Sequence, residues 1–385
     1  MRIVDLTQHV AGPFATLLLA ELGHDVIKVE RPGAGDPLRR RTLTEPHDAG
    51  FDYLNRRKRG VTLNLKDRRG RALLKRLAAE ADAVVESFRP GVLARLGISL
   101  RSLRGANRDI VLTSISNFGQ TGPRRDWPAS EIVLQATGGI VAASGWAEGS
   151  PLRLAGNVAQ HIGGLNAAIA TIAAVLGVQA GLERGVQLDI SIQEAFAAHW
   201  ARHISQYIHH GLEIARESPV AGKQGFPHTV RASDGWLYIL ALRAEWESFA
   251  HFLGLDRFTT HEWSDHEARQ SRWNELGPAF HAAVAARGRL DWFADAAERG
   301  YTFAPIDDPL GLLHSPQLIA CGMFTAATLS DGAEVACPRL PFTGSEPPAT
   351  PNRAPALGEH NAEVYGSLLG LGGAELEALR AAGVI

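Results

Sequence analysis

The sequence predicts an α/β fold in which helices connect the strands of a doubly wound parallel sheet. Three observations carry this prediction. Short apolar runs typical of buried strands recur in the first half of the chain, helix-length amphipathic segments separate them, and the spacing matches that of β-α-β units. At 385 residues the chain is long enough for two or three domains of roughly 150 residues each.

The first β-α-β unit lies at the N-terminus. A strand is expected at Ile3–Leu6 and a second at Asp25–Glu30, with a helix between them that begins near Pro13 and ends at Gly23. The turn after the first strand lacks the GxGxxG pattern. A nicotinamide or flavin site therefore has little support there.

Further elements continue the alternation of strands and helices. In chain order we expect a strand at Val61–Leu65, a helix at Asp67–Ala81, a strand at Ala83–Glu86, a helix near Gly91–Leu103, strands at Ile110–Ser116 and Val186–Ile192, and a helix at Glu194–His209. The Gly- and Pro-rich loop 117–128 follows a strand, where ligands of such folds usually bind. A domain boundary is expected in the loop-like segment 211–230, before a smaller second module.

Composition limits the classes of function. The formal net charge of −2 argues against a dedicated nucleic-acid-binding protein. The two cysteines, Cys321 and Cys337, predict neither a disulfide framework nor a zinc ribbon. Because Arg2 leads directly into a strand-like run, and the apolar stretches are broken by polar residues, we expect no signal peptide and no membrane span, and a cytoplasmic location.

The segment from Pro151 to Val175 is expected to position the chemistry. A turn around Gly156–Asn157 leads into an apolar helix whose first turn carries Gln160 and His161. The large apolar residues after it recur at helical spacing (Leu165, Ile169, Ile172 and Leu176), which predicts a helix. The small Gly and Ala residues between them would let another backbone approach closely, so we expect this helix at the centre of a packed domain. Gln160 is compatible both with a functional role and with that of a buried, satisfied amide.

Two other groups of residues have a functional and a purely structural interpretation. Basic residues cluster in the loops near the first strands (Arg31, Arg39, Arg40, Arg41, Arg56, Arg57, Lys58 and Arg59) and form either a phosphate site or a solvated surface. His199 and His203 are four residues apart on the expected helix, but the Glu of a zinc-protease motif is missing. We therefore expect no metal site.

Taken together, these segments resemble the family III CoA-transferases, which include formyl-CoA transferase, carnitine CoA-transferase, bile-acid-inducible F-like proteins and the related α-methylacyl-CoA racemases. The resemblance runs nearly end to end. It is carried by VDLTQHVAGPFATLLLAELGHDVIKVERPGAGDP, NRRKRGVTLNL, VVESFRPGVLARLGIS, SISNFGQTGP, GVQLDISIQEA, APIDDPLGLLHSPQL and RAPALGEHNAEVYGSLLGL.

The resemblance implies an architecture and a ligand. The architecture is a Rossmann-like large domain that begins with residues 1–210, a smaller α+β domain at 211–325, a C-terminal segment 326–385 that returns to the large domain, and an interlocked homodimer. The ligand is coenzyme A or an acyl-CoA, with a carboxylic acid as the possible acceptor. Positions that match CoA contacts of the family are Val10, Arg31, Leu63, Lys66, Ser87, Phe88 and Arg95.

The chain departs from the family at the catalytic position. The resemblance implies an Asp nucleophile at the turn before the apolar helix, and this sequence has Gln160 there. A neutral amide is a far poorer nucleophile than a carboxylate. Glu131 matches a second active-site Glu of the family, whereas His161 would point roughly 100° away around the helix. The racemase pair is unsupported, because its His position is Ser130.

Three hypotheses follow. The leading one is a CoA-transferase in which Glu131 or His161 substitutes for the Asp, or in which the acyl group passes directly to its acceptor. The second is a catalytically silent CoA-binding subunit that pairs with an Asp-bearing paralogue. The third is another acyl-CoA reaction in which Gln160 donates a hydrogen bond to an oxyanion.

Overall fold

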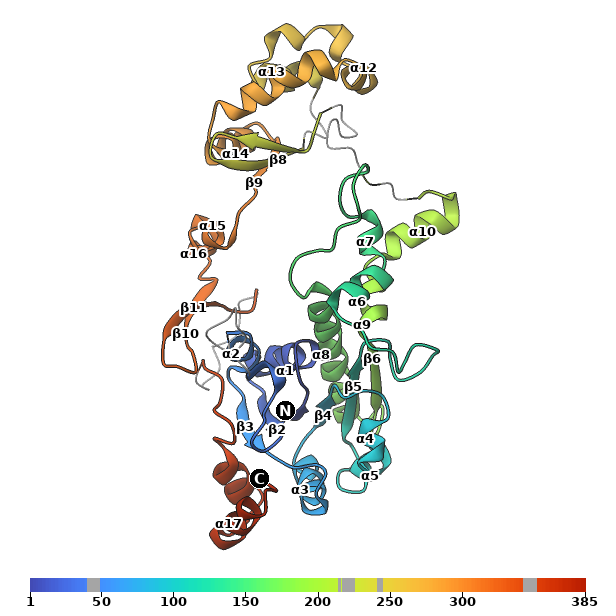
Figure 1. Cartoon of the computed structure of the whole chain (residues 1–385), viewed down its shortest axis with the longest axis vertical. Helices are drawn as coiled ribbons and strands as arrows, with labels where there is room; N and C mark the ends of the chain where they lie inside the picture. The colour runs from blue at the N-terminus through green and yellow to red at the C-terminus, as the bar shows by residue number, and fades with distance from the viewer. Residues whose placement is uncertain (40–48, 214–215, 217–225, 241–244, 342–351) are drawn as a thin grey trace. The chain divides into compact units, whose positions relative to one another are not determined.

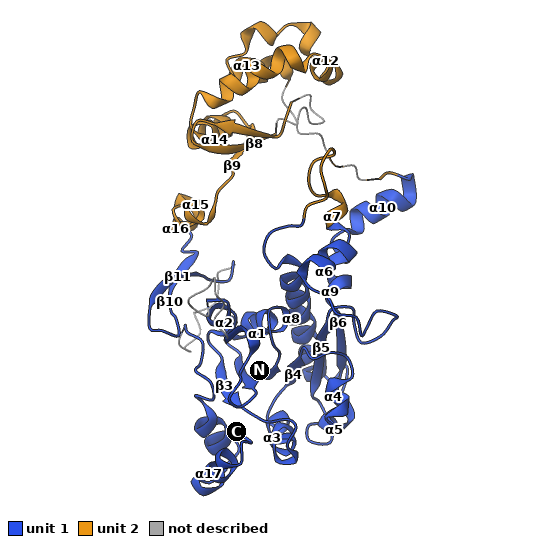
Figure 2. Cartoon of the chain, in the orientation of Figure 1, with its two compact units in different colours: residues 1–140, 153–211, 321–385 blue, residues 141–152, 212–320 orange. Residues whose placement is uncertain are grey.

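The computed structural model describes residues 1–39, 49–213, 216, 226–240, 245–341 and 352–385. These residues form two compact units (Figure 2). Unit 1 comprises residues 1–140, 153–211 and 321–385, and unit 2 comprises residues 141–152 and 212–320. The domain limits expected from the sequence, 1–210, 211–325 and 326–385, differ from these units mainly at residues 141–152. The loop expected at 211–230 lies largely outside the described residues.

A six-stranded parallel sheet forms the framework of unit 1 (Figure 1). Its strands are β1 (Arg2–Leu6), β2 (Asp25–Glu30), β3 (Arg59–Thr62), β4 (Ala83–Glu86), β5 (Val111–Ser116) and β6 (Gln187–Ser191). They lie in the order β3-β2-β1-β4-β5-β6, and every neighbouring pair is parallel. This strand order is that of dinucleotide-binding α/β folds. The predicted α/β class is confirmed.

Both faces of this sheet are buried by helices. On β1, Ile3 belongs to one apolar core and Val4 to the other, since successive side chains point to opposite faces. One core contains buried residues of α3 (Arg68–Ala79), α5 (Leu100–Arg104) and α17 (Gly373–Ala381), and the other contains those of α1 (Ala11–Glu21), α8 (Val158–Gln179) and α9 (Ile192–Ala198). The continuous apolar strands of the sequence reflect this two-sided burial.

Helix α8 packs through its small residues. A Cβ atom added at Gly164 would lie 2.4 Å from the carbonyl oxygen of Ala11, so the backbones of α8 and α1 are in direct contact. The buried face of α8 consists of small and medium-sized residues: Ala159, Gly163, Gly164, Ala167, Ala168, Thr171 and Val175. The close approach expected from the Gly and Ala residues is confirmed, whereas the large apolar residues Leu165, Ile169 and Leu176 lie on the other side and are exposed by 43%, 59% and 56%.

By length and composition α8 could cross a membrane. One such helix is weak evidence for a membrane span, because core helices of soluble proteins are equally long and apolar, and the small face of α8 packs in the core with α1 and α9.

Two predicted helices are each interrupted. The helix expected at 91–103 is divided into α4 (Val92–Arg95) and α5, since Gly97 between them adopts a φ of +71°. The helix expected at 194–209 is divided into α9 and α10 (Ala201–His210), and the amides of His199 and Trp200 close the last turn of α9 with bonds to residues three positions earlier. His199 and His203 therefore do not share one continuous helix.

The other elements of unit 1 complete the two layers. Helix α2 (Ala49–Asn55) precedes β3, and α6 (Glu131–Thr137) is followed by α7 (Ile140–Ala143), whose residues 141–143 belong to unit 2. The C-terminal segment contains the hairpin β10 (Phe324–Thr328) and β11 (Glu334–Pro338) and the π-helix 362–368. It covers the outer edge of β3, where Tyr365 Oη donates to Thr62 O over 2.9 Å and Thr62 N donates to Asn361 Oδ1 over 2.8 Å.

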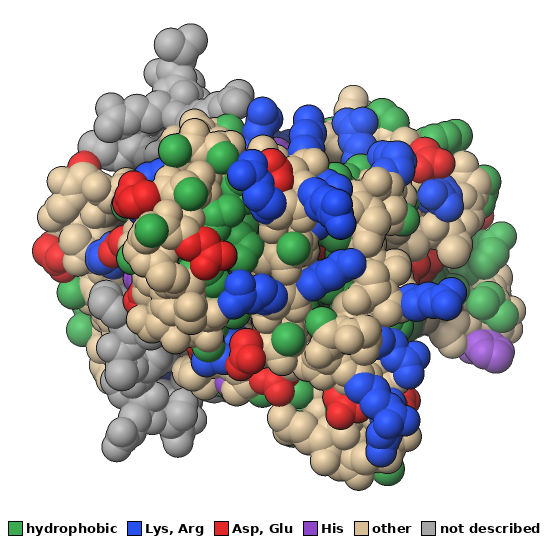
Figure 3. Space-filling model, turned by 90° about the horizontal axis from the view of Figure 1, so that it is seen from below, with side chains coloured by type: hydrophobic (Ala, Val, Ile, Leu, Met, Phe, Trp, Pro, Cys, Tyr) green, Lys and Arg blue, Asp and Glu red, His purple; other side chains and the backbone are tan. Residues whose placement is uncertain are grey.

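Basic side chains gather over the end of unit 1 at which α3 lies (Figures 1 and 3). Asp67 caps this helix by accepting a bond from the Arg69 amide. The apolar side of α3 contributes Leu73, Leu74 and Leu77 to the core, and its other side carries Arg and Lys. This arrangement is that of an ordinary amphipathic surface helix.

Unit 2 has its own apolar core. A three-stranded antiparallel sheet of β7 (Thr229–Ala232), β8 (Gly235–Leu240) and β9 (Thr302–Pro305) contributes residues to the same aromatic cluster as α11 (Trp246–Phe252), α13 (Trp273–Ala285) and α14 (Arg289–Glu298). Its shorter helices include α12 (His266–Ser271), α15 (Pro309–Leu313) and α16 (Pro316–Ala320).

Candidate active site

A cavity of about 770 Å³ opens at the carboxyl ends of the central strands of unit 1. Its walls come from the turn after β1, the turn after β4, the loop after β5, and the first turns of α6 and α8. The strand order reverses between β1 and β4, and ligands of open α/β sheets bind at this switch point. The volume suits a small-molecule or cofactor site.

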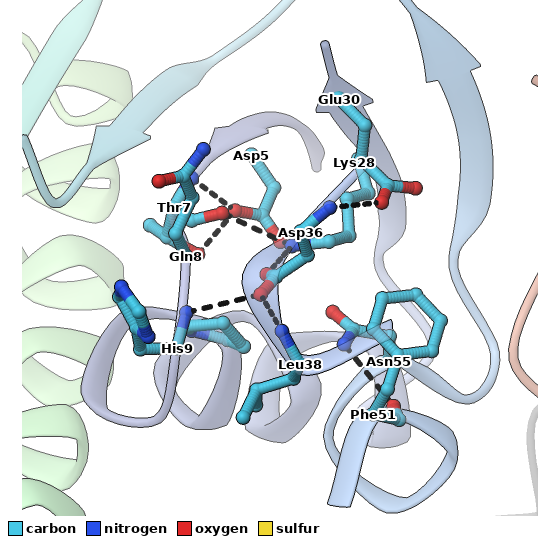
Figure 4. Close-up of polar contacts among 12 residues, drawn as sticks. Asp5, Thr7, Gln8, His9, Lys28, Glu30, Asp36, Leu38, Phe51 and Asn55 are labelled. Atoms are coloured by element: carbon cyan, nitrogen blue, oxygen red, sulfur yellow. Dashed lines mark hydrogen bonds and ion pairs between the residues drawn. The ribbon is translucent and has the colours of Figure 1, made fainter. Parts of the chain in front are cut away.

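A buried polar network supports the turn after β1 (Figure 4). Lys28 and Asp36 are both buried, and Lys28 Nζ donates to Asp36 Oδ2 and to the carbonyl oxygen of Thr7, over 3.0 Å in each case. Asp36 Oδ1 accepts the backbone N–H of His9 over 3.3 Å. The backbone N–H of Gln8 donates to Ser87 Oγ over 2.9 Å, which connects this turn to the turn after β4.

The same network contains a second buried ion pair, in which Lys58 Nζ lies 3.0 Å from Asp5 Oδ2. Burial alone would raise the pKa of Asp5, but Lys58, Lys28 and the hydroxyl groups of Thr7 and Thr16 outweigh it and lower this pKa to about 2. Burial lowers the pKa of Lys58 to about 8. Both groups are therefore ionised near neutral pH.

We expect Asp5 to contribute to acid unfolding. Since its folded pKa lies below the ordinary value of 3.8, its contribution is complete above that pH and is lost as the pH falls toward about 2. The free energy of unfolding should decrease by on the order of 2 kcal/mol from this group over that window. Urea unfolding at a series of acidic pH values measures the slope, which should be flatter in Asp5→Asn. Equal slopes in the two proteins would contradict the ionised pair.

Arginine side chains line one side of the cavity. Arg89, Arg95 and Arg125 all contribute to its wall. The guanidinium groups of Arg95 and Arg125 both lie near Gly91, where a Cβ atom would be 3.2 Å from Arg95 Nη1 and 3.8 Å from Arg125 Nη2. Gly91 also has a φ of +78°, a conformation that favours glycine at this position. Convergent guanidinium groups are suited to binding phosphate oxygens.

A carboxylate lies at the first turn of α8. Glu131 Oε1 accepts the backbone N–H of Ala159 and the side-chain amide of Gln135, each over 2.8 Å, and Oε2 accepts the backbone N–H of Gln160 over 3.3 Å. Asn157, the residue before the helix, makes no side-chain capping bond. Glu131 therefore caps α8 from another helix, a position that the N–H groups and dipole of α8 favour for negative charge.

The structure brings most of the predicted site residues together. Six of them line the cavity: Val10, Ser87, Phe88, Arg95, Glu131 and Gln160. The other four do not. Arg31 and Lys66 are exposed shortly after β2 and β3, and Leu63 is buried in a core. Their contact with CoA stays a prediction.

His161 does not line the cavity. Its ring packs edge-on against Phe14 with 4.6 Å between centroids, and its Nδ1 lies 2.8 Å from the carbonyl oxygen of Asn157. The sequence prediction that His161 points away from Gln160 agrees with this placement.

Most of the basic cluster serves the fold. Arg39 pairs with Glu30, Arg56 and Arg57 pair with Glu21, and Arg59 pairs with Asp25. Together with the Lys58–Asp5 pair, these contacts give all five residues acidic partners within the fold, an arrangement that neither sequence interpretation of the cluster included. Arg40 and Arg41 lie outside the described residues.

Sequence reasoning missed several residues of the cavity. His9, Arg89 and Arg125 line it, and the sequence patterns did not single them out. Arg125 belongs to the loop after β5, which the sequence predicts as a ligand-binding loop without assigning its side chains. In the described part of the chain, no cluster of three or more His, Cys, Asp or Glu side chains is suited to hold a metal ion.

The fold and the cavity define an α/β protein with a cationic small-molecule site at the switch point of a parallel sheet. The model of the CoA-transferase family III matches residues 1–361, and the chain belongs to this family.

Relatives match over almost their whole length. The chain is 30% identical to the formyl-CoA:oxalate CoA-transferase of Streptomyces avermitilis, covering 100% of this chain and 98% of the relative. It is also 30% identical to the succinyl-CoA–D-citramalate CoA-transferase of Chloroflexus aurantiacus, covering 100% and 97%. A crystal structure of a CaiB/BaiF family protein from Brucella suis has a TM-score of 0.83 at 27% identity, covering 96% of this chain and 98% of that protein.

Proposed function

We propose that this protein transfers CoA between an acyl-CoA and a carboxylic acid. The observation that carries the proposal is the end-to-end family match together with a cavity that holds both arginines and a carboxylate. The arginines suit the phosphates of CoA, and the carboxylate suits covalent chemistry on a thioester. The relatives of named activity are CoA-transferases, which favours transfer over the silent-subunit and other acyl-CoA alternatives.

We assign the nucleophile to Glu131 rather than to Gln160 or His161. Gln160 lines the cavity but carries a neutral amide, and His161 packs against Phe14 outside the cavity lining. Among the described residues, only the backbone N–H of Gln160 donates to Oε2 of Glu131, over 3.3 Å, so this oxygen keeps lone pairs available for attack.

The proposed transfer requires only the acyl-CoA, the acceptor acid and Glu131. Glu131 Oε2 attacks the thioester carbonyl, the C–S bond breaks, and a mixed anhydride and CoA thiolate form. The thiolate attacks the glutamyl carbonyl, releases the first acid as its carboxylate, and leaves a glutamyl-CoA thioester. The acceptor carboxylate then repeats the two steps in reverse, which yields the new acyl-CoA and restores Glu131. CoA binds through the cationic side of the cavity, with Val10, Ser87, Phe88 and Arg95 as contacts.

The test is a transfer assay with the purified wild-type protein. Formyl-CoA and succinyl-CoA serve as donors, oxalate, citramalate and glutarate as acceptors, and chromatography follows the product acyl-CoA. A thermal-shift titration with CoA runs in parallel, because a ligand of the native state raises the melting temperature. CoA binding without transfer from any donor in a broader acyl-CoA panel would contradict the proposed activity.

We further propose that the protein acts as a homodimer, interlocked as the family resemblance implies, in the cytoplasm. Leu165, Ile169 and Leu176 form an exposed apolar stripe on α8, and α10 has no buried residue although Ile204 and Ile208 lie on it. Exposed apolar patches of this kind mark protein interfaces, and a second copy of the chain is the occupant we assign. The low cysteine content, two residues in the whole sequence, suits a reducing compartment.

Ile169→Glu should convert the dimer into a monomer, since a charge in an apolar interface loses its hydration without gaining a partner. Size-exclusion chromatography with light scattering measures the mass of both proteins. Ile169→Leu, which keeps the apolar stripe, is the control and should remain dimeric. A wild-type protein that is monomeric at all concentrations would contradict the assignment.

A further inference from the structure

His9 has an unusual backbone conformation in the wall of the cavity. Among the described residues other than glycine, only His9 and Arg57 have a positive φ, 65° in both. The left-handed region is sterically unfavourable for a residue with a Cβ atom. A glycine would avoid this cost, so the histidine side chain at this position needs its own explanation. Strained residues that the surroundings hold in place cluster at binding and catalytic sites.

The surroundings hold His9 through a buried charge pair. Lys28 and Asp36 are 0% and 1% exposed. Their bonds fix the backbone on both sides of Gln8, at the carbonyl of Thr7 and at the N–H of His9. The backbone N–H of Asp36 in turn donates to Glu30 Oε2 over 2.9 Å. Burying two ions is costly even when they pair, and here the pair fixes the turn from which His9 projects.

The imidazole itself is left available to a ligand. His9 is exposed and lines the cavity. In Figure 4 its ring extends away from Asp36, although its backbone nitrogen bonds to that residue. Within the described part of the chain, no residue forms a hydrogen bond with the ring. Both ring nitrogens can therefore donate to or accept from a bound molecule.

We propose that the imidazole of His9 forms a hydrogen bond with the CoA-linked ligand in this cavity, and that the Lys28–Asp36 pair positions it. The proposal rests on the proposed function, since it requires the cavity to bind CoA or an acyl-CoA. It adds a ligand contact made by a side chain at a position where the backbone alone would favour glycine.

The experiment compares two substitutions that remove the same backbone strain. His9→Gly removes the imidazole inside the cavity. Arg57→Gly is the matched control, because Arg57 has the same φ but lies outside the cavity lining. Isothermal titration calorimetry with CoA and with acetyl-CoA measures affinity for the full-length protein and both variants, and thermal unfolding without ligand measures stability.

His9→Gly should bind CoA or acetyl-CoA about tenfold more weakly, the amount expected for one lost hydrogen bond. Its melting temperature should not fall. Arg57→Gly should bind both ligands as the wild type does. If His9→Gly weakens the binding of both ligands, the imidazole contacts the CoA portion. If it weakens only the binding of acetyl-CoA, the imidazole contacts the acyl end.

A third variant tests the positioning role. Lys28→Met combined with Asp36→Leu replaces the buried pair by apolar groups of similar size, which many folds tolerate. It should weaken binding when His9 is present and cause little further loss in His9→Gly, because coupled residues are not additive.

If the wild type binds CoA and acetyl-CoA and His9→Gly binds both equally well, the ligand contact is overturned and the proposed function is untouched. A wild-type protein that binds neither ligand would overturn the proposed function and this inference together.

Discussion

Glu131→Gln should abolish CoA transfer, with turnover reduced roughly 10³-fold or more, as expected when a covalent nucleophile is removed. The amide oxygen of the glutamine can still accept an N–H group at the start of α8, whereas the anion that attacks the thioester is gone. The fold should change little, because the helix loses one of its two N–H bonds to this side chain and the interaction of its dipole with one charge, the latter about 0.3–1 kcal/mol. The transfer assay and thermal unfolding measure the two effects separately.

A matched variant and a trapping experiment make this result specific. Glu194 also lies in the first turn of a helix of unit 1, but it does not line the cavity. Glu194→Gln should therefore keep wild-type turnover. Hydroxylamine added to wild type during turnover should convert the activated side chain into a hydroxamate, and mass spectrometry should find it on the peptide that contains Glu131. Full activity of Glu131→Gln would show that the acyl group reaches its acceptor by another route.

The sheet could be predicted from the sequence because its signal is local. Each strand is a short apolar run between turn residues, and the bounds predicted for β2 and β4 are those observed. The orientation of α8 could not be predicted in this way. Its large apolar residues follow helical spacing, but the close approach to Ala11 at Gly164 requires the small face to turn inward. Apolar periodicity finds a helix face and does not say which partner covers it.

The candidate site was predictable in position and less so in detail. Gln160 lines the cavity, and so does Glu131, which the family resemblance identified as a second active-site position. The capping of α8 by Glu131 joins residues that are 28 and 29 positions apart, so no local pattern encodes it. The charge cluster shows the same limit. Asp5, Glu21 and Glu30 form ion pairs with three residues of the basic cluster. Because these acidic residues lie elsewhere in the sequence, the sequence pattern shows the basic residues without their partners.

Gln160→Asp should restore transfer to Glu131→Gln. The backbone N–H of Gln160 lies 3.3 Å from Glu131 Oε2, and both side chains line one cavity, so the substitution returns a single carboxylate to the same turn. The double variant should exceed Glu131→Gln in turnover by at least about tenfold, a gain of roughly 1.4 kcal/mol in transition-state stabilisation. The trapped hydroxamate should move to the peptide that contains position 160.

In the wild-type background the same substitution should have a different effect. The new carboxylate would lie beside that of Glu131, and two neighbouring carboxylates raise each other's pKa because like charges repel. Gln160→Asp alone should therefore shift the acidic limb of the pH–rate profile to higher pH, with transfer retained. An inactive wild type that gains turnover only through Gln160→Asp would contradict the transferase proposal. The native chain would then be a protein that binds CoA without transferring it. Its cavity would lack only the Asp nucleophile of the family, in whose position Gln160 stands.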